Sequence, residues 1–167
     1  MIYDQPAVNA GIAQGDPLEN CPILAIKTFD AVSGMAIEID FGVRRVVVLI
    51  QTCDLANEKM TAVNVAEVHD AQTLVNERLF KPADIKGPVR AGRVWGWYFL
   101  PADPKLGLPE MMVDLRWLHT IPVDLLNLLC QTGRRKARIK PLYREHLAKH
   151  FADTFSRIGL PRPYETM

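Results

Sequence analysis

The feature that most constrains this chain is a run of five apolar residues, Val46-Val47-Val48-Leu49-Ile50. β-branched residues dominate the run, which indicates a β-strand. Because no polar residue alternates with the apolar ones, the strand must be covered on both faces. We therefore expect it to be buried at the centre of a sheet.

Several β-rich runs accompany this strand, and the breaks between them, such as Val32-Ser33-Gly34 and Phe41-Gly42-Val43, fit tight connections. The expected strands cover residues 22–29, 35–41, 44–52, 60–68, 93–100 and 110–115. Short strands joined by tight turns favour an antiparallel meander. The sequence predicts an α+β fold, in which a curved antiparallel sheet or an SH3-like β-barrel of five to seven strands carries C-terminal helices.

Capping residues, prolines and glycines predict where the helices begin and end. Asp70 is the expected N-cap of a short helix to about residue 79, and residues 81–92, rich in Pro and Gly, should form a loop. One helix should begin at Pro122 and end before Gly133. Another should begin at Pro141, with a buried stripe and an abrupt stop formed by Leu147, Phe151, Phe155, Ile158, Gly159 and Pro161.

The composition is that of one globular domain covering residues 1–167. The chain is 49% hydrophobic and carries 20 Lys and Arg against 19 Asp and Glu. We expect an irregular N-terminal arm over 1–20, a barrel-like sheet over 21–120 with a helical insertion near 70–80, and two helices over 121–160. A chain of this length folds without a disulfide or structural metal, and we expect no cofactor.

Features of membrane and secreted proteins are missing from the sequence. The longest apolar runs are far shorter than the ~18 residues that a transmembrane helix needs. The first residues lack the basic head and apolar core of a signal peptide, so we expect a cytoplasmic protein without a membrane partner. Cys21, Cys53 and Cys130 form no C-x-x-C pair and should be reduced thiols.

Charge is unevenly distributed along the chain. Residues 134–149 carry a net charge of +6, and the remainder carries −5. Such a segment can face phosphates, an acidic partner, or the acidic body of its own protein or of a second copy, which would make a homodimer. The alternative is a solvated helix with a basic linker.

Several short motifs, taken in order, resemble a known family. They are Gln14-Gly15-Asp16, the strand Arg44-Arg45-Val46-Val47-Val48-Leu49 followed by Asp54 and Asn57, residues 61–68, and Val113-Asp114-Leu115 leading to Thr120. This order is similar to that of the PemK/MazF/Kid-like family of SH3-like barrels, which includes ribonucleases of toxin–antitoxin pairs. Val46 replaces the family's proline after the arginines, and Glu67-Val68-His69 stands where the toxins offer Thr or Ser.

A second resemblance covers more of the chain. The segment Gln51-Thr52-Cys53-Asp54-Leu55, with Arg144-Glu145-His146-Leu147 and residues 157–161, looks like an uncharacterised group of bacterial proteins with a Q-[ST]-C-D-L signature. This resemblance implies no particular activity.

Cys53 and Asp54 follow the apolar strand, where side chains can emerge into a cleft. A Cys53 thiolate would need a neighbouring base, for which His69 and His119 are the candidates outside helices. The alternative is a buried cysteine serving as a small apolar residue while Asp54 caps a turn.

His146 and His150 are four residues apart on one helical face, a spacing that can chelate a transition metal. The sequence suggests no third ligand, and paired histidines on a basic helix are usually exposed. We therefore predict no metal site.

Arg44 and Arg45 precede the apolar strand, and alternation should direct one of them into a groove. There it could bind a phosphate, helped by Arg93 and by the basic residues Arg134, Arg135, Lys136, Arg138 and Lys140. Aromatic side chains nearby could stack on bases; they are Trp95, Trp97, Tyr98 and Phe99. The alternative buries these aromatics in the core and leaves the arginines in ordinary ion pairs.

Three functions follow from these readings. The leading hypothesis is a non-enzymatic binding or accessory module of bacterial or phage type, which contacts nucleic acid or an acidic protein through its basic C-terminal region. The rival is a MazF-like endoribonuclease, in which Arg45 would stabilise the phosphate and Asp54 or His69 would transfer protons. The third is a structural subunit that binds a protein partner.

Overall fold

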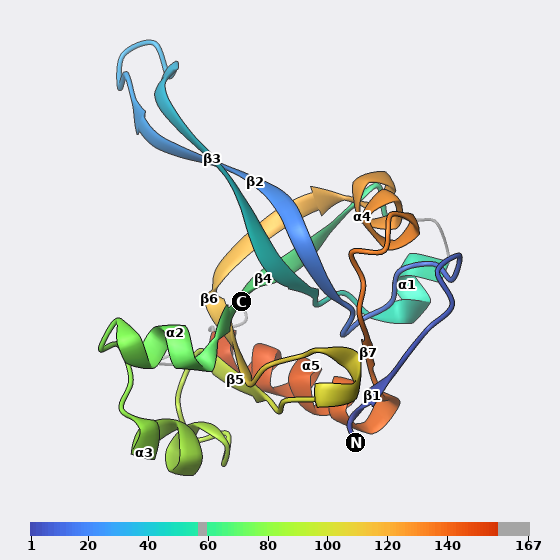
Figure 1. The fold of residues 1–167 in the computed structure, drawn as a ribbon. Coiled ribbons are helices and arrows are strands. Elements are labelled where there is room, and N and C mark those ends of the chain that lie inside the picture. Colours follow the sequence, from blue (N-terminus) through green and yellow to red (C-terminus); the bar gives the residue numbers. More distant parts are fainter. Residues whose placement is uncertain (57–59, 157–167) are drawn as a thin grey trace, which may run out of the picture.

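A five-stranded antiparallel sheet forms the centre of the computed structural model, which describes residues 1–56 and 60–156 (Figure 1). Its strands follow the order β2 (Pro17–Phe29), β3 (Ala36–Val48), β4 (Ala62–Asp70), β6 (Met111–Pro122) and β5 (Trp97–Leu100). A small second sheet pairs β1 (Tyr3–Asp4) with β7 (Arg138–Ile139). Within the described residues no pairing joins β5 to β2, so the sheet is open. The predicted α+β fold is confirmed, in its curved-sheet form.

Two helices cover opposite faces of the sheet. The helices and helical turns are α1 (Thr52–Ala56), α2 (Ala71–Asn76), α3 (Pro82–Asp84), a π-helical turn (Ile85–Val89), a 3₁₀ turn (Pro104–Leu106), α4 (Val123–Gln131) and α5 (Pro141–Phe155). Leu126 and Leu129 of α4 pack on one face, and Leu147 of α5 packs on the other. None of the helices in the described part of the chain is long and apolar enough to cross a membrane.

The apolar strand is buried on both faces, as predicted. Val46 and Val48 belong to the cluster under α4, whereas Val47 and Leu49 belong to the cluster under α5. The predicted central position is wrong, because β3 is second in the sheet and β4 lies at its middle. A strand that is buried on both faces need only lie inside the sheet and not at its edge. The apolar run therefore could not determine the position of β3 in the strand order.

The expected break at Phe41-Gly42-Val43 is absent, and residues 36–48 form the single strand β3. These three residues pair with Leu24, Ile23 and Pro22 of β2, so the glycine lies within a strand. The turn of this hairpin falls at residues 30–35, where the Val-Ser-Gly break predicted it. The resulting β2–β3 ribbon projects far from the rest of the molecule (Figure 1).

The predicted loop over 81–92 is wrong, because α3 and the π-helical turn occupy most of it. Pro82 stands at the first helical position. Its missing N–H costs nothing there, because the first N–H groups of a helix have no acceptor within the helix. Ile85 and Val89 then bury their side chains against Leu74 of α2. Asp70 does precede α2, but its carboxylate forms an ion pair with Arg45 and makes no capping hydrogen bond.

The N-terminal arm is more ordered than predicted. Tyr3 and Asp4 pair with Ile139 and Arg138 of β7, and residues 12–16 are buried. Gly15, which has φ +77°, donates from its nitrogen to the Val48 carbonyl and accepts from the Ile139 nitrogen. A Cβ at Gly15 would lie 3.0 Å from the Ile139 Cβ, so this close approach favours glycine. The arm thus connects the main sheet to the C-terminal segment.

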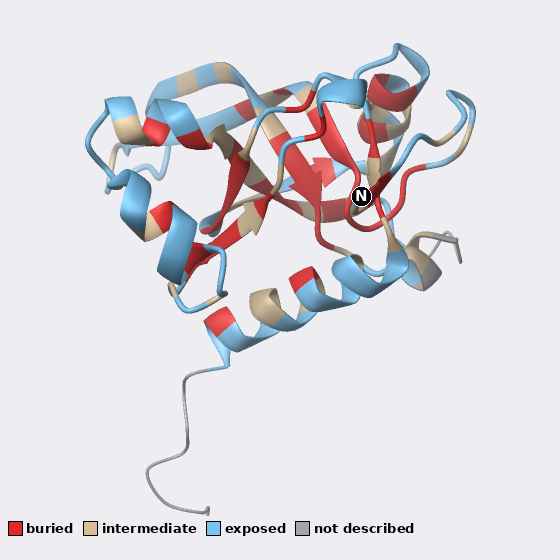
Figure 2. Ribbon diagram, turned by 60° about the horizontal axis from the view of Figure 1, so that its bottom comes forward, coloured by how far each residue is buried: buried red, intermediate tan, exposed pale blue. Residues whose placement is uncertain are grey.

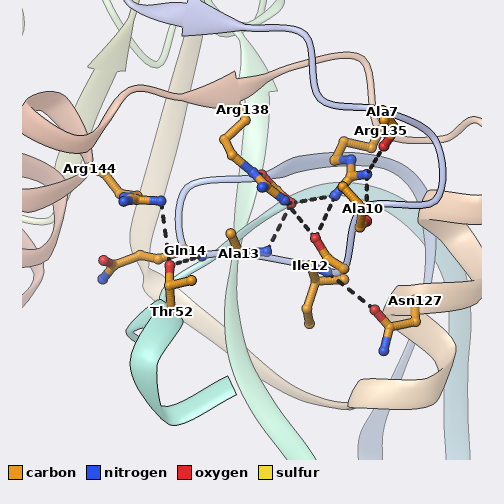
Figure 3. Close-up of polar contacts among 12 residues, drawn as sticks. Ala7, Ala10, Ile12, Ala13, Gln14, Thr52, Asn127, Arg135, Arg138 and Arg144 are labelled. Carbon is orange, nitrogen blue, oxygen red and sulfur yellow. Dashed lines mark hydrogen bonds and ion pairs between the residues drawn. The ribbon is translucent and has the colours of Figure 1, made fainter. Parts of the chain in front are cut away.

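Asp16 is completely buried and is held by two arginines, Arg135 and Arg138, both of which Figure 3 labels. Arg138 donates to both carboxylate oxygens at 2.7 and 2.8 Å, and Arg135 donates to Oδ2 at 3.0 Å. The Ala13 nitrogen donates to the same oxygen at 3.0 Å. Four donated hydrogen bonds therefore satisfy a charge that burial alone would make very costly.

The same arginines bind the main chain of the N-terminal arm. Arg135 donates to the carbonyls of Ala7, Ala10 and Gly11, and Arg138 donates to that of Gly11. Lys140 lies 3.6 Å from Asp4. Of the readings of the basic segment, the one that directs it to the acidic body of its own chain is therefore confirmed for Arg135, Arg138 and Lys140.

Helix α5 begins at Pro141, as predicted, and runs along the molecule with its buried residues coloured red (Figure 2). Leu147 is fully buried and Phe151 is half-buried, but Phe155 is exposed, so the buried stripe is shorter than predicted. Phe155 instead makes an edge contact with Phe151 at a ring distance of 5.4 Å. The predicted end of the stripe and its stop, residues 158–161, lie outside the described residues.

Replacing Asp16 should strongly destabilise the fold. Asp16→Asn leaves the buried guanidinium of Arg135 and the partly buried one of Arg138 without their carboxylate, so we expect the free energy of unfolding to fall by about 3–5 kcal/mol. Denaturation in urea measures this loss. Asp153→Asn is the matched control, because Asp153 pairs with Lys149 in solvent, and it should change stability by less than about 0.5 kcal/mol. Equal effects of the two substitutions would contradict the anchoring role of Asp16.

His150 should make the protein less stable in acid. Burial, and next the charge of His146, hold the pKa of His150 below its ordinary value of 6.5, although Asp153 opposes the shift. Below about pH 6.5 the His150 imidazole therefore binds a proton more readily in the unfolded chain than in the folded one. Stability is thus lost as the pH falls below about 6.5. In urea denaturation from pH 7.5 to 5, His150→Gln should lose less stability than the wild type. A steeper loss in the variant would contradict this sign.

Candidate active site

A cleft of about 400 Å³ lies on the sheet face opposite α5, within the size range of small-ligand sites. One wall is the base of the β2–β3 ribbon, and the other is α2 with the segment that follows it. Strands β4, β5 and β6 form the floor. The polar and aromatic residues that line it are Asp40, Arg44, Glu67, His69, Glu77, Trp97, Asp114, Arg116, Trp117 and His119.

Pairing across the sheet brings the floor residues onto one face. Glu67 is opposite Val46 on β3 and opposite Asp114 on β6, and Asp114 is opposite Trp97 on β5. His69 lies two residues beyond Glu67 and so points to the same face. The strand alternation that places Val46 in the core also places these side chains in the cleft.

A bulge in β6 brings further side chains to the same place. Ala66 pairs with Leu118, but the next residue, Glu67, pairs with Asp114, so β6 contains three extra residues at this point. Two of them, Arg116 and Trp117, line the cleft, and so does His119, two residues after Trp117. β-bulges often lie beside active sites, where they redirect side chains.

Glu67 is the centre of the cleft's polar contacts. Its Oε1 lies 2.8 Å from Nε2 of His119, and both side chains are only 14% exposed. Its Oε2 lies 3.9 Å from Nε2 of His69 and 3.8 Å from Nε of Arg44. The last two distances exceed hydrogen-bonding range, so His69 and Arg44 approach the carboxylate without being bonded to it.

Arg44 occupies its position because residue 42 is glycine. A Cβ at Gly42 would lie 2.7 Å from Nη1 of Arg44, closer than real Cβ contacts allow. The guanidinium therefore packs over the strand and remains about half exposed at the edge of the cleft. The glycine that the sequence indicated as a turn thus makes room for a cation.

Arg116 is held on the opposite side. It donates to both oxygens of Asp114 at 2.7 and 2.8 Å, and its guanidinium carbon lies 4.8 Å from the centre of the Trp97 ring. The hydrogen bonds to Asp114 raise the pKa of Arg116 further above its already high value, so it is a permanent cation. Gly96, with φ +75°, makes room for it, because a Cβ there would lie 2.6 Å from the Arg116 Cγ.

The structure brings some of the predicted site residues together. Arg44 and His69 line the cleft, as does His119, which the sequence offered as a base. Arg45 does not, because it forms ion pairs with Glu19 and Asp70. Asp54 lies in α1, also away from the cleft lining. The side chain of Cys53 lies outside the described part, so the thiolate hypothesis stays a prediction.

The predicted phosphate-binding cations do not form one cluster. Arg135, Arg138 and Lys140 contact the N-terminal arm, and Arg93 lies near His150, whereas Arg134 and Lys136 are exposed. Among the aromatics, Trp97 lines the cleft and Tyr98 is buried on the other face. Trp95 donates to the Thr154 carbonyl at 3.0 Å.

The two helical histidines both face Tyr98. His146 Nδ1 lies 3.1 Å from the Tyr98 hydroxyl, and the His150 ring lies 5.7 Å from the Tyr98 ring. Among the described residues, no group of three or more His, Cys, Asp or Glu side chains is placed to hold a metal ion.

Glu67, Asp114, Arg116 and Trp117 were missed by the sequence analysis. The spacing Glu67-x-His69 within one strand could have indicated a shared face, because residues two apart in a strand point the same way. No such signal existed for β6, since the bulge decides which of its residues reach the cleft.

Comparison with known proteins assigns no family. The chain matches no protein-family model, and no curated protein is significantly similar to it.

Gly96→Ala should disrupt the Arg116 side of the cleft. Both its positive φ and the clash with Arg116 oppose a methyl group, so we expect a loss of more than about 1 kcal/mol in unfolding free energy and a change in Trp fluorescence. Gly107→Ala is the control, because Gly107 has a similar φ of +66° but a Cβ there would meet no atom within 4 Å. Equal losses of unfolding free energy in the two variants would show that position 96 does not require glycine to make room for Arg116.

Proposed function

We propose that this protein cleaves RNA in the cleft, without a covalent intermediate. The observation that carries the proposal is the position of Glu67, with His119 at 2.8 Å, Arg44 at 3.8 Å and His69 at 3.9 Å. A carboxylate, two imidazoles and a guanidinium in one cleft are the groups that acid–base cleavage of a phosphodiester needs.

Each group has a role in this reaction. The Glu67 carboxylate, oriented by His119, accepts the proton of a ribose 2′-hydroxyl. The 2′-oxygen then bonds to the adjacent phosphorus, and the bond from phosphorus to the 5′-oxygen breaks. His69, the more exposed histidine, donates the proton that the leaving 5′-oxygen needs. The products are a 2′,3′-cyclic phosphate and a 5′-hydroxyl, and no water or oxidant is consumed.

The remaining cleft residues fit a nucleotide. Arg44 and Arg116 can stabilise the negative charge that develops on the phosphate oxygens. Trp117 is 62% exposed beside the cleft and offers a face on which a base can stack. Four carboxylates also line the cleft, so the positive charges of Arg44 and Arg116 offset them when a phosphate binds.

The contacts in the molecule favour RNA cleavage in the cleft over nucleic-acid binding through the basic segment, residues 134–149. Arg135 is only 2% exposed and is committed to Asp16, so the segment offers fewer free cations than its sequence suggests. Arg134 and Lys136 remain exposed, and they carry the second candidate, a module that binds nucleic acid without cutting it.

The test is incubation of the full chain with a single-stranded oligoribonucleotide of mixed sequence. We expect fragments ending in 2′,3′-cyclic phosphate, and no cleavage of the same strand carrying 2′-O-methyl groups. Glu67→Gln and His69→Ala should each lower the rate about 10²–10⁴-fold, which is the usual contribution of a positioned acid or base. Glu110→Gln, which removes a charge paired with Arg90 outside the cleft, is the control and should leave the rate unchanged.

Two outcomes would overturn the proposal. Cleavage that survives Glu67→Gln and His69→Ala would place the activity elsewhere. Binding of intact RNA that falls steeply with salt and is weakened by Arg134→Ala or Lys136→Ala would favour the binding module.

A further inference from the structure

The outer β2–β3 ribbon has one face that is apolar and uncovered. By alternation, Leu24 and Ile26 of β2 share this face with Ile37, Ile39, Phe41 and Val43 of β3. Pairing places Leu24 opposite Phe41 and Ile26 opposite Ile39. These six side chains are between 54% and 70% exposed. A patch of this kind on a protein surface usually marks an interaction site.

The other face of the ribbon is different. Ile23, Ala25, Asp40 and Gly42 line the cleft, and farther out Lys27 forms an ion pair with Glu38 at 3.4 Å. All charged side chains of the paired strands between residues 22 and 43 therefore belong to the cleft face. The ribbon is amphipathic. Its polar face lines the cleft, whereas its apolar face stays exposed in the described part of the chain.

The chemistry of the apolar face restricts what can cover it. Without a cation, it cannot bind nucleic acid by phosphate contacts. Lipid is also unfavourable, because the outer ribbon has only two strands and its outward backbone groups would lack hydrogen bonds in hydrocarbon. An apolar protein surface remains as the occupant.

We infer that this face binds the same face of a second copy of the chain. Two identical apolar sheet faces can stack at the ~10 Å spacing of packed sheets, and a two-fold axis makes each contact occur twice. An uncharged face carries no feature that would select a charged partner, whereas a two-fold axis sets the apolar side chains of one copy against those of the other.

The apolar area of this face is close to what a dimer interface needs. A large apolar side chain carries roughly 60–120 Å² of apolar surface, so six chains that are about two-thirds exposed supply on the order of 400 Å² per copy. A standard interface buries about 800 Å² per partner, of which somewhat more than half is apolar. The apolar face thus provides the core of such an interface, and its surroundings provide the polar rim.

This dimer would leave the cleft open, because the cleft lies on the opposite face of the ribbon. It would also fix the ribbon that forms one wall of the cleft. The inference does not depend on RNA cleavage, since it uses only the exposed face and its pairing.

Sedimentation velocity of the full chain between about 1 and 100 µM tests the inference. We expect a dimer in the wild type, and at least a tenfold weaker association for Leu24→Thr/Phe41→Thr. Both positions are exposed and Thr suits a strand, so the melting temperature should change little. Leu142→Thr is the control, because Leu142 is 72% exposed on α5, away from the ribbon, and it should not alter the dimer.

A second measurement uses proximity. Ile39→Cys in a Cys53→Ser background should form an intermolecular disulfide under mild oxidation, whereas Cys53→Ser alone, with Cys21 and Cys130 buried, serves as the blank. A monomeric wild type at 100 µM, or a dimer unaffected by the double substitution, would overturn the inference. Flotation of a monomeric wild type with phosphatidylcholine and phosphatidylglycerol vesicles, lost in the double variant, would overturn it in favour of lipid.

Discussion

The buried carboxylate of Asp16 holds the two ends of the chain together. Arg135 and Arg138 come more than a hundred residues later, yet both donate to it, and Arg138 also belongs to the small second sheet. The neighbouring Gly15 is bonded to Val48 on one side and Ile139 on the other. Removing one partner of such a buried pair leaves an uncompensated charge, so Asp16 adds a strong link to the backbone and core contacts that attach the N-terminal arm and α5 to the sheet.

This anchoring leaves the opposite sheet face available for a cleft. Helix α5 covers the face that carries Val47 and Leu49, and α4 covers only part of the face that carries Val46 and Val48. Beyond α4, the same alternation that supplies core valines supplies Glu67, His69 and His119, and the β6 bulge adds Arg116 and Trp117. The cleft is therefore a continuation of the hydrophobic core, in which polar side chains replace apolar ones.

The sequence predicted the elements better than it predicted the site. Strong local signals worked: the apolar run of β3, Pro141 at the start of α5 and Gly133 after α4 all correspond to the structure. Signals that depend on distant residues failed. Gly42 and Gly96 make room for arginines two and twenty residues away, and Asp70 pairs with Arg45 in place of capping α2. The sequence left open whether the basic segment faces its own chain or an outside partner, because its buried partner, Asp16, lies near the other end of the chain.

The two faces of the β2–β3 ribbon connect the separate parts of the molecule. Residues that face the cleft, such as Asp40 and Arg44, alternate with exposed apolar residues such as Phe41 and Val43. A two-stranded ribbon is only marginally stable by itself, so its outer part gains order from whatever covers either face. Contact on the apolar face therefore favours the conformation that places Arg44 beside Glu67. Because coupling between two sites is reciprocal, a ligand that binds Arg44 in the cleft would favour the same contact in turn.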